Sequence, residues 1–223
     1  MTRVLLAAMM MMAAGSGGSR VLFDGTNTDA WRGYKREGFP DKGWAVKDGM
    51  LYPVPGGDRV DLVTKDVYKD FDLELEWKVG AHGNSGVMYD VAETEPETYY
   101  TGPEMQILDD LGHKDGQNSK TSAGALYALV APSAAKALKP VGEWNKARIV
   151  KKGNHVEHWL NGKKIVEYTL GSPELDALIR DSKFKDWARF GKEGQGHIVL
   201  QHHDNDEAYF RNIRITGTPV KTK

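Results

Sequence analysis

The sequence predicts an all-β protein built as a β-sandwich of two antiparallel sheets, and three observations support this fold class. Segment 71–79 (FDLELEWKV) alternates apolar and charged residues strictly, which places one set against a core and the other in water. Asn161-Gly162 separates two strand-like segments and is typical of a two-residue hairpin turn. Roughly a dozen such segments, joined by tight turns, fit one sandwich domain.

The other expected strands follow one another along the whole chain. Segment 43–52 predicts two short strands around a Lys47-Asp48-Gly49 turn. One or two short helices are expected: the first within 172–184, where Ser172 is a candidate N-cap and Pro173 suits the first helical position, and a shorter helix or turn at 133–138. The remaining expected strands are 85–91, 103–109, 124–130, 144–153, the hairpin 155–168, 197–203 and 208–216.

The N-terminus has the pattern of an export signal. Arg3 precedes an apolar run from Val4 to Ala14, and a Gly/Ser/Ala tract follows. This run is too short to span a bilayer, which favours a signal peptide. We expect a signal peptide or disordered leader over 1–19, a single sandwich domain over 20–217 and a tail over 218–223. The protein is then periplasmic or secreted, without membrane insertion.

Charge and composition exclude several functions. The chain has 30 basic and 31 acidic residues, so it lacks the basic excess of a nucleic-acid-binding protein. It has no cysteine, which excludes disulfides, thiolate catalysis and thiolate metal sites. The composition leaves the oligomeric state open.

The strand at 103–109 carries the first candidate site. Period two places Met105 and Ile107 on one face and Glu104 and Gln106 side by side on the other. Such a pair is common on any solvated sheet, so it is only a candidate for function. Asp109 falls at the strand end, where a supporting role is expected.

A second polar segment follows at 197–207. Gln201 and His203 share a strand face, and histidine is the side chain best suited to proton transfer near neutral pH. A solvated turn is the alternative. Histidines and carboxylates gather at 109–115 and 202–207, so a divalent metal is possible, but no recognised ligand spacing is present and no metal ligand is assigned.

Weaker candidates lie elsewhere in the chain. Asn84 is in an expected turn from which its amide can face a ligand. His158 is in a hairpin strand, where a hydrogen-bonded structural role competes with substrate binding. Arg211 can bind a sugar hydroxyl or pair with a nearby acid. Tyr89 and Tyr127 can supply stacking surfaces or pack in the core.

Eight short segments occur in a characteristic order along the chain: LFDG (22–25), GNSGVMY (83–89), GPEMQILD (102–109), GALY (124–127), VGEWN (141–145), HVEHWLNG (155–162), GHIVLQHH (196–203) and YFRNIRI (209–215). Together they resemble the 3-keto-disaccharide hydrolase family, and the resemblance runs from segment 22–31 to 209–215. The resemblance implies a concanavalin A-like jelly roll, export in bacteria and activity on 3-keto-glycosides or 3-keto-disaccharides. Two departures are Asp90, where many relatives have Arg, and His202-His203-Asp204, where many have Asp-His-Gly.

The resemblance and the strand pattern together define the expected site. Glu104 and His203 are the expected catalytic pair, one acting as base and the other as acid. The reaction implied is removal of the C2 proton of a 3-keto sugar, elimination of the C1 substituent and net hydrolysis. The expected substrate-binding residues are Asn84, Tyr89, Gln106, Tyr127, His158, Gln201 and Arg211, and the supporting residues are Asp109, Glu143 and Asn145.

Two alternatives remain open at this point. A non-catalytic carbohydrate-binding module would present exposed aromatic residues and would not need an acid–base pair. A laminarinase-like hydrolase would show an E-x-D-x-x-E strand. Here Gln106 takes the place of the helper aspartate and Asp109 that of the acid.

Overall fold

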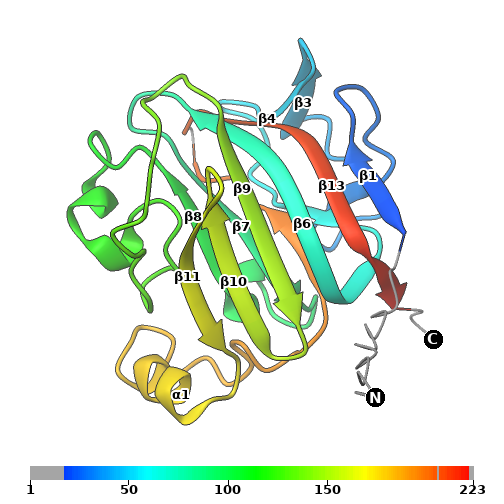
Figure 1. Ribbon diagram of the computed structural model, residues 1–223. Coiled ribbons are helices and arrows are strands. Elements are labelled where there is room, and N and C mark those ends of the chain that lie inside the picture. Colours follow the sequence, from blue (N-terminus) through cyan, green and yellow to red (C-terminus); the bar gives the residue numbers. More distant parts are fainter. Residues whose placement is uncertain (1–17, 205, 221–223) are drawn as a thin grey trace, which may run out of the picture.

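The computed structural model describes residues 18–204 and 206–220 and contains two antiparallel sheets packed face to face (Figure 1). The larger sheet consists of β1 (Ser19–Phe23), β3 (Trp44–Lys47), β4 (Met50–Pro53), β6 (Val67–Val79), β9 (Asn145–Lys152), β10 (His155–Leu160), β11 (Lys163–Thr169) and β13 (Ala208–Val220). The smaller sheet consists of β2 (Trp31–Gly33), β5 (Leu62–Thr64), β7 (Asn84–Val91), β8 (Glu104–Leu108) and β12 (His197–Leu200).

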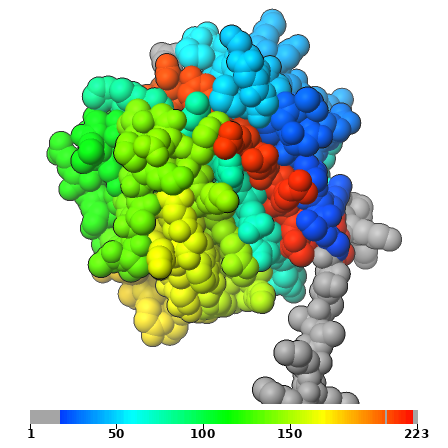
Figure 2. Space-filling model, turned by 45° about the horizontal axis from the view of Figure 1, so that its top comes forward, coloured from blue at the N-terminus to red at the C-terminus, as the bar shows by residue number. Residues whose placement is uncertain are grey.

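The strand order confirms the predicted all-β sandwich. The larger sheet runs β11-β10-β9-β6-β13-β4-β3, with β1 paired to β13, and the smaller sheet runs β2-β5-β12-β7-β8. Strands β1 and β13 come from opposite ends of the chain and lie side by side, as the blue and red segments show in Figures 1 and 2. The two ends of the domain are thereby joined in one sheet.

The hydrophobic core lies between the two sheets. On β6 the alternation predicted from sequence places Leu73 and Trp77 inside, with 0% and 1% exposed surface. Ile107 of β8 meets the core from the smaller sheet and is 0% exposed. Burying such large apolar side chains is the main stabilising contribution of the fold. Because each inward residue alternates with an outward one, the core also fixes which side chains the sheets present outside.

Both predicted hairpin turns, at Lys47-Asp48-Gly49 and at Asn161-Gly162, are confirmed. Asp48 and Gly49 join β3 to β4 with φ values of 52° and 74°. Asn161 and Gly162 join β10 to β11 with φ values of 48° and 79°. Positive φ at both central positions matches the twist of the flanking strands, which is why Asn-Gly and Asp-Gly favour hairpins.

The predicted helix is α1 (Pro173–Arg180), which packs below β10 and β11 in Figure 1. Ser172 caps it by accepting a hydrogen bond from the Leu175 backbone N–H at 3.2 Å. In the segment 133–138, where a short helix or turn was expected, residues 134–135 form a turn. Within the described chain no helix has the length and apolar character needed to cross a membrane. Three short 3₁₀ helices are η1 (Thr98–Tyr100), η2 (Lys114–Gln117) and η3 (Ser119–Thr121).

The strand expected at 124–130 is wrong, because this segment folds into turns. Gly124 and Ala128 adopt φ values of 82° and 60°, and both residues lie in turns instead of the extended conformation typical of a strand. Backbone hydrogen bonds still tie the segment to the free edge of β8, through Gly124 N–H to Gln106 O at 2.8 Å and Gln106 N–H to Ala125 O at 3.1 Å. The segment therefore covers an edge strand.

The first and last strands lie near the expected limits of the sandwich domain. Strand β1 begins at Ser19, and β13 continues to Val220, beyond the expected boundary at 217. Most of the expected leader lies outside the described residues.

Candidate active site

A cavity of about 320 Å³ opens on the outer face of the smaller sheet. Strands β7 and β8 and the segment that follows β12 contribute to its lining, together with residues around 99 and within 183–190. Six of the expected site residues line it: Asn84, Glu104, Gln106, Tyr127, Gln201 and His203. The other lining residues are Arg59, Tyr99, Gly102, Lys183, Phe184, Trp187 and Phe190.

Glu104 lies at the floor of this cavity and is 8% exposed. Its carboxyl group is packed over Gly86 of β7: a Cβ at position 86 would lie 1.9 Å from Glu104 Oε1. Burial raises the pKa of Glu104 to about 8, and the charge on Lys183 opposes this shift. Glu104 is therefore a neutral acid at pH 7, with a proton to donate.

His203 faces the same cavity and is held by a carboxylate. Its Nδ1 lies 2.6 Å from Asp206 Oδ2, so Nδ1–H donates to Asp206. This bond leaves Nε2 as the unprotonated nitrogen, 3.4 Å from the amide nitrogen of Asn84. A carboxylate that fixes the tautomer and orientation of a histidine is a recurring feature of general bases. Asp206 belongs to the polar segment 197–207, but the sequence did not indicate its contact with His203.

Two amide oxygens in the cavity are available to a ligand. Asn84 Oδ1 and Gln106 Oε1 are buried and have no hydrogen-bond partner within the described structure. The Gln106 amide nitrogen donates to Thr121 O at 3.3 Å, so the amide oxygen is the end of this side chain that lacks a partner. Buried polar atoms usually have partners, so two free acceptors in one cavity indicate a ligand that donates hydrogen bonds. Sugar hydroxyls do so.

Tyr127 and Lys183 form one side of the cavity. The Lys183 ammonium lies 4.2 Å from the centroid of the Tyr127 ring, and the Tyr127 hydroxyl donates to Asp115 at 3.4 Å. The ring thus attracts the cation and holds it beside the cavity. Lys183 follows α1, and nothing in the strand pattern indicated that it would reach this site.

A cluster of aromatic residues that was not expected from the sequence completes the wall. Phe184 and Phe190 are stacked with ring centroids 4.1 Å apart, and Trp187 lies 5.5 Å from Tyr99. The spacing of the three aromatic residues in FKDWARF (184–190) was the available signal. Their rings are held by one another, so they give the cavity a rigid apolar side.

Tyr89 and His158, expected to bind substrate, do not reach the cavity. Both are 0% exposed in the core, where the Tyr89 hydroxyl donates to His158 Nε2 at 2.8 Å and also contacts the Tyr168 hydroxyl. His158 Nδ1–H donates to Gly124 O at 3.1 Å, and burial lowers the pKa of His158 to about 4. The two residues form a neutral structural network, which corrects the expectation of substrate contact.

Arg211 lies on the outer face of the larger sheet, away from the cavity. It donates to Glu76 Oε2 at 2.6 Å and stacks on Trp144, 4.0 Å from the ring centroid. The structure therefore does not support substrate contact by Arg211 in this cavity. Asp90, one of the two departures from the family pattern, lies on β7 of the smaller sheet, is 1% exposed and pairs with Lys151 at 3.0 Å.

The expected supporting residues have three different positions. Asp109 accepts backbone N–H bonds from His82, Leu111 and Gly112, which fix the loop after β8. Burial alone would raise the pKa of Asp109, but these bonds outweigh burial and lower it. Asn145 is buried and joins Lys139 N–H to Asn161, whereas Glu143 is exposed.

The described residues include one group of three side chains close enough to share a metal ion, and it is not at the cavity. His155, Glu157 and Glu167 lie on β10 and β11. Lys164 already pairs with Glu157 at 3.1 Å and with Glu167 at 2.6 Å. The clusters expected at 109–115 and 202–207 do not form such a group among the described residues.

The fold defines a broad class of jelly-roll sandwiches, with the polar cavity on one sheet. The laminarinase from Rhodothermus marinus shares this fold, with a TM-score of 0.53 and 10% identity over 92% of this chain and 97% of that one. A solved structure from Parabacteroides distasonis, assigned as a candidate glycosyl hydrolase, is much more similar. It has a TM-score of 0.81 and 32% identity over 90% of this chain and 94% of that one.

Residues 18–216 match the family described as a 3-keto-alpha-glucoside-1,2-lyase-like domain, and the chain belongs to this family. The 3-keto-disaccharide hydrolase of Bacteroides thetaiotaomicron is 33% identical over 224 aligned residues, covering 87% of this chain and 76% of that protein. The family resemblance read from the sequence is thereby confirmed, and with it the expectation of an enzyme.

Proposed function

We propose that this chain cleaves 3-keto-glycosides, including 3-keto-disaccharides, by removing the C2 proton and eliminating the C1 substituent, with net hydrolysis. The observation that carries this proposal is the pairing, in one cavity, of a neutral Glu104 with a carboxylate-held His203. The name of the Bacteroides relative supports the substrate class.

The first step is proton removal by His203. A ketone at C3 acidifies the proton on C2, so a base of ordinary strength can take it. His203 Nε2 accepts this proton, and Asp206 stabilises the resulting imidazolium through its bond to Nδ1. The electrons of the C2–H bond form an enolate, whose negative charge is on the C3 oxygen.

The enolate then collapses and expels the C1 substituent. The C3 carbonyl reforms, a C1–C2 double bond forms and the bond from C1 to the leaving oxygen breaks. Glu104 gives its proton to that oxygen, so the leaving group departs as an alcohol. Addition of water across C1 and C2 completes the hydrolysis and gives the 3-keto sugar.

Cationic and amide groups around the cavity stabilise the enolate. Lys183 and Arg59 line it and are the candidate partners for the C3 oxygen, whose charge develops during proton removal. Asn84 Oδ1 and Gln106 Oε1 accept hydrogen bonds from ring hydroxyls and orient the sugar. Correct orientation lowers the barrier further, because the reacting groups no longer have to be brought together during the reaction.

The cavity fits the two alternatives less well. A conventional glycosidase uses two carboxyl groups flanking the scissile bond. Glu104 is the one carboxyl group among the described lining residues, and Asp109 is engaged with backbone N–H groups. A binding module does not require a neutral acid and an oriented histidine in one cavity, and the aromatic residues here line the wall of that cavity.

The substrate class is tested with matched pairs of glycosides. We expect the purified protein to release the aglycone from 3-keto-glucosides and not to cleave the same glucosides with an ordinary C3 hydroxyl. The reason is that only the ketone acidifies C2. Product release is measured by chromatography. Equal cleavage of both members of each pair would indicate a conventional glycosidase, and binding of both without cleavage would indicate a carbohydrate-binding module.

The close contact between β7 and Glu104 gives a second test. We expect Gly86→Ala to lower kcat/KM at least about tenfold, equivalent to roughly 1.4 kcal/mol. The added Cβ would lie 1.9 Å from Glu104 Oε1 and must displace the acid. Gly38→Ala is the control, because a Cβ there meets nothing within 4 Å. Equal activity of both variants and the wild type would show that Glu104 need not occupy this position.

A further inference from the structure

A second pocket adjoins the cavity on the side of β12. Its volume is about 210 Å³. The two hollows share three lining residues, Arg59, Tyr99 and Gln201. Glu104 and His203 line the cavity but not the second pocket, so the reacting sugar ring is expected to bind in the cavity. We infer that this adjoining pocket binds the leaving group of the substrate, and that the leaving group is a second sugar ring or a similar polyhydroxyl alcohol. This inference rests on the proposed function.

The size of the cavity supports a divided site. Its volume of about 320 Å³ is near the lower end for pockets that enclose a small molecule. A disaccharide has two rings, and the second must lie beyond the bond that breaks. The adjoining pocket is the continuation of the cavity past Gln201, which places it where that second ring would extend.

The chemistry of the adjoining pocket suits hydroxyl groups. His202 lines it, is 2% exposed, and its Nδ1 is buried without a hydrogen-bond partner within the described structure. Asp61 lines it as well and joins its two sides: it accepts from the His202 backbone N–H at 2.8 Å and from the Thr98 hydroxyl at 2.5 Å. Tyr99, at the junction, presents an aromatic ring to either sugar. A hydroxyl donor would satisfy the free His202 nitrogen.

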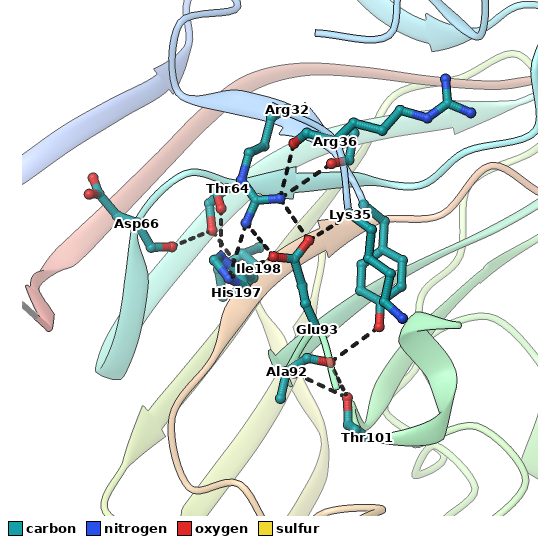
Figure 3. A network of polar contacts seen from close by, with 12 residues as sticks. Arg32, Lys35, Arg36, Thr64, Asp66, Ala92, Glu93, Thr101, His197 and Ile198 are labelled. Atoms are coloured by element: carbon teal, nitrogen blue, oxygen red, sulfur yellow. Dashed lines mark hydrogen bonds and ion pairs between the residues drawn. The ribbon is translucent and has the colours of Figure 1, made fainter. Parts of the chain in front are cut away.

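The outer wall of the pocket is held in place before any ligand arrives (Figure 3). Arg32 donates from both terminal nitrogens to Glu93, each at 2.7 Å. Glu93 also accepts the backbone N–H of Lys35 at 2.6 Å, and Arg32 donates to Arg36 O at 3.3 Å. This half-buried network positions Lys35 and Arg36, two of the lining residues, which lowers the entropic cost of binding.

A large side chain placed in the adjoining pocket tests its role separately from that of the cavity. Glu97 is exposed and lines the pocket but not the cavity. We expect Glu97→Trp to lower kcat/KM for a 3-keto-disaccharide at least tenfold and to change that for methyl 3-keto-glucoside less than twofold. The methyl group is too small to need the pocket. Lys152→Trp, at an exposed position of β9 on the other sheet, should leave both values unchanged.

The possible outcomes distinguish a failure of the assignment of the pocket from a failure of the proposed function. Retained activity on the methyl glycoside shows that Glu97→Trp is folded and catalytically intact. Equal losses on both substrates, or no loss on either, would overturn the assignment of the pocket while leaving the proposed function standing. If the wild-type protein cleaves neither 3-keto-glycoside, the proposed function fails and this inference fails with it.

Discussion

The variant His203→Asn is expected to lower kcat/KM for a 3-keto-glycoside by about 10²–10⁴-fold, the usual contribution of a general base. Asparagine keeps a polar side chain of similar reach but cannot take up the C2 proton. The loss should appear in kcat, because the enolate forms only after the substrate is bound. Steady-state kinetics on the same substrate for both proteins measure it.

Two further variants make this result specific. His155→Asn makes the same substitution on β10 of the other sheet and should retain wild-type activity. Asp206→Asn keeps the shape of the partner of Nδ1 but removes its charge, so kcat should fall by a smaller factor while KM stays nearly constant. A loss below tenfold for His203→Asn would remove this residue from the role of base.

The part of the site on regular strands could be predicted because strands have a fixed period. Met105 and Ile107 had to enter the core, so Glu104 and Gln106 had to face outward together, and they line the cavity. The same rule, applied from Asn84 along β7, would have placed Tyr89 on the inner face, an odd number of residues away. The family resemblance identified Tyr89 without telling which face it occupies.

The remainder of the site depends on irregular segments, for which the sequence has no comparable rule. Lys183 and Trp187 follow α1 in a loop whose path is set by packing onto the smaller sheet. Asp206 contacts His203 from a position three residues further along the chain. Residues 124–130 are apolar without strict alternation, and such a run does not distinguish a strand from a compact turn. Tertiary contacts decide these conformations.

The variant Glu104→Gln should lower kcat/KM by about 10²–10⁴-fold, because glutamine matches the shape of the neutral acid but does not transfer its proton to the leaving oxygen. In the wild-type protein, burial raises the pKa of Glu104 to about 8. Wild-type activity should therefore fall as the pH rises through about 8, where Glu104 loses the proton it must donate. This decrease is measured from the pH profile of kcat/KM.

The pH dependence of the free energy of unfolding tests the raised pKa of Glu104 independently of activity. The folded pKa of Glu104 lies above its ordinary value of 4.5, so between pH 4.5 and about 8 the folded state binds more protons than the unfolded state. The free energy of unfolding must then decrease with rising pH across this window. Glu104→Gln has no proton to lose, so its urea midpoint should exceed that of the wild type at pH 8. If the two midpoints instead change in parallel between pH 5 and 8, Glu104 is ionised in the folded protein, and the acid must be sought elsewhere in the cavity.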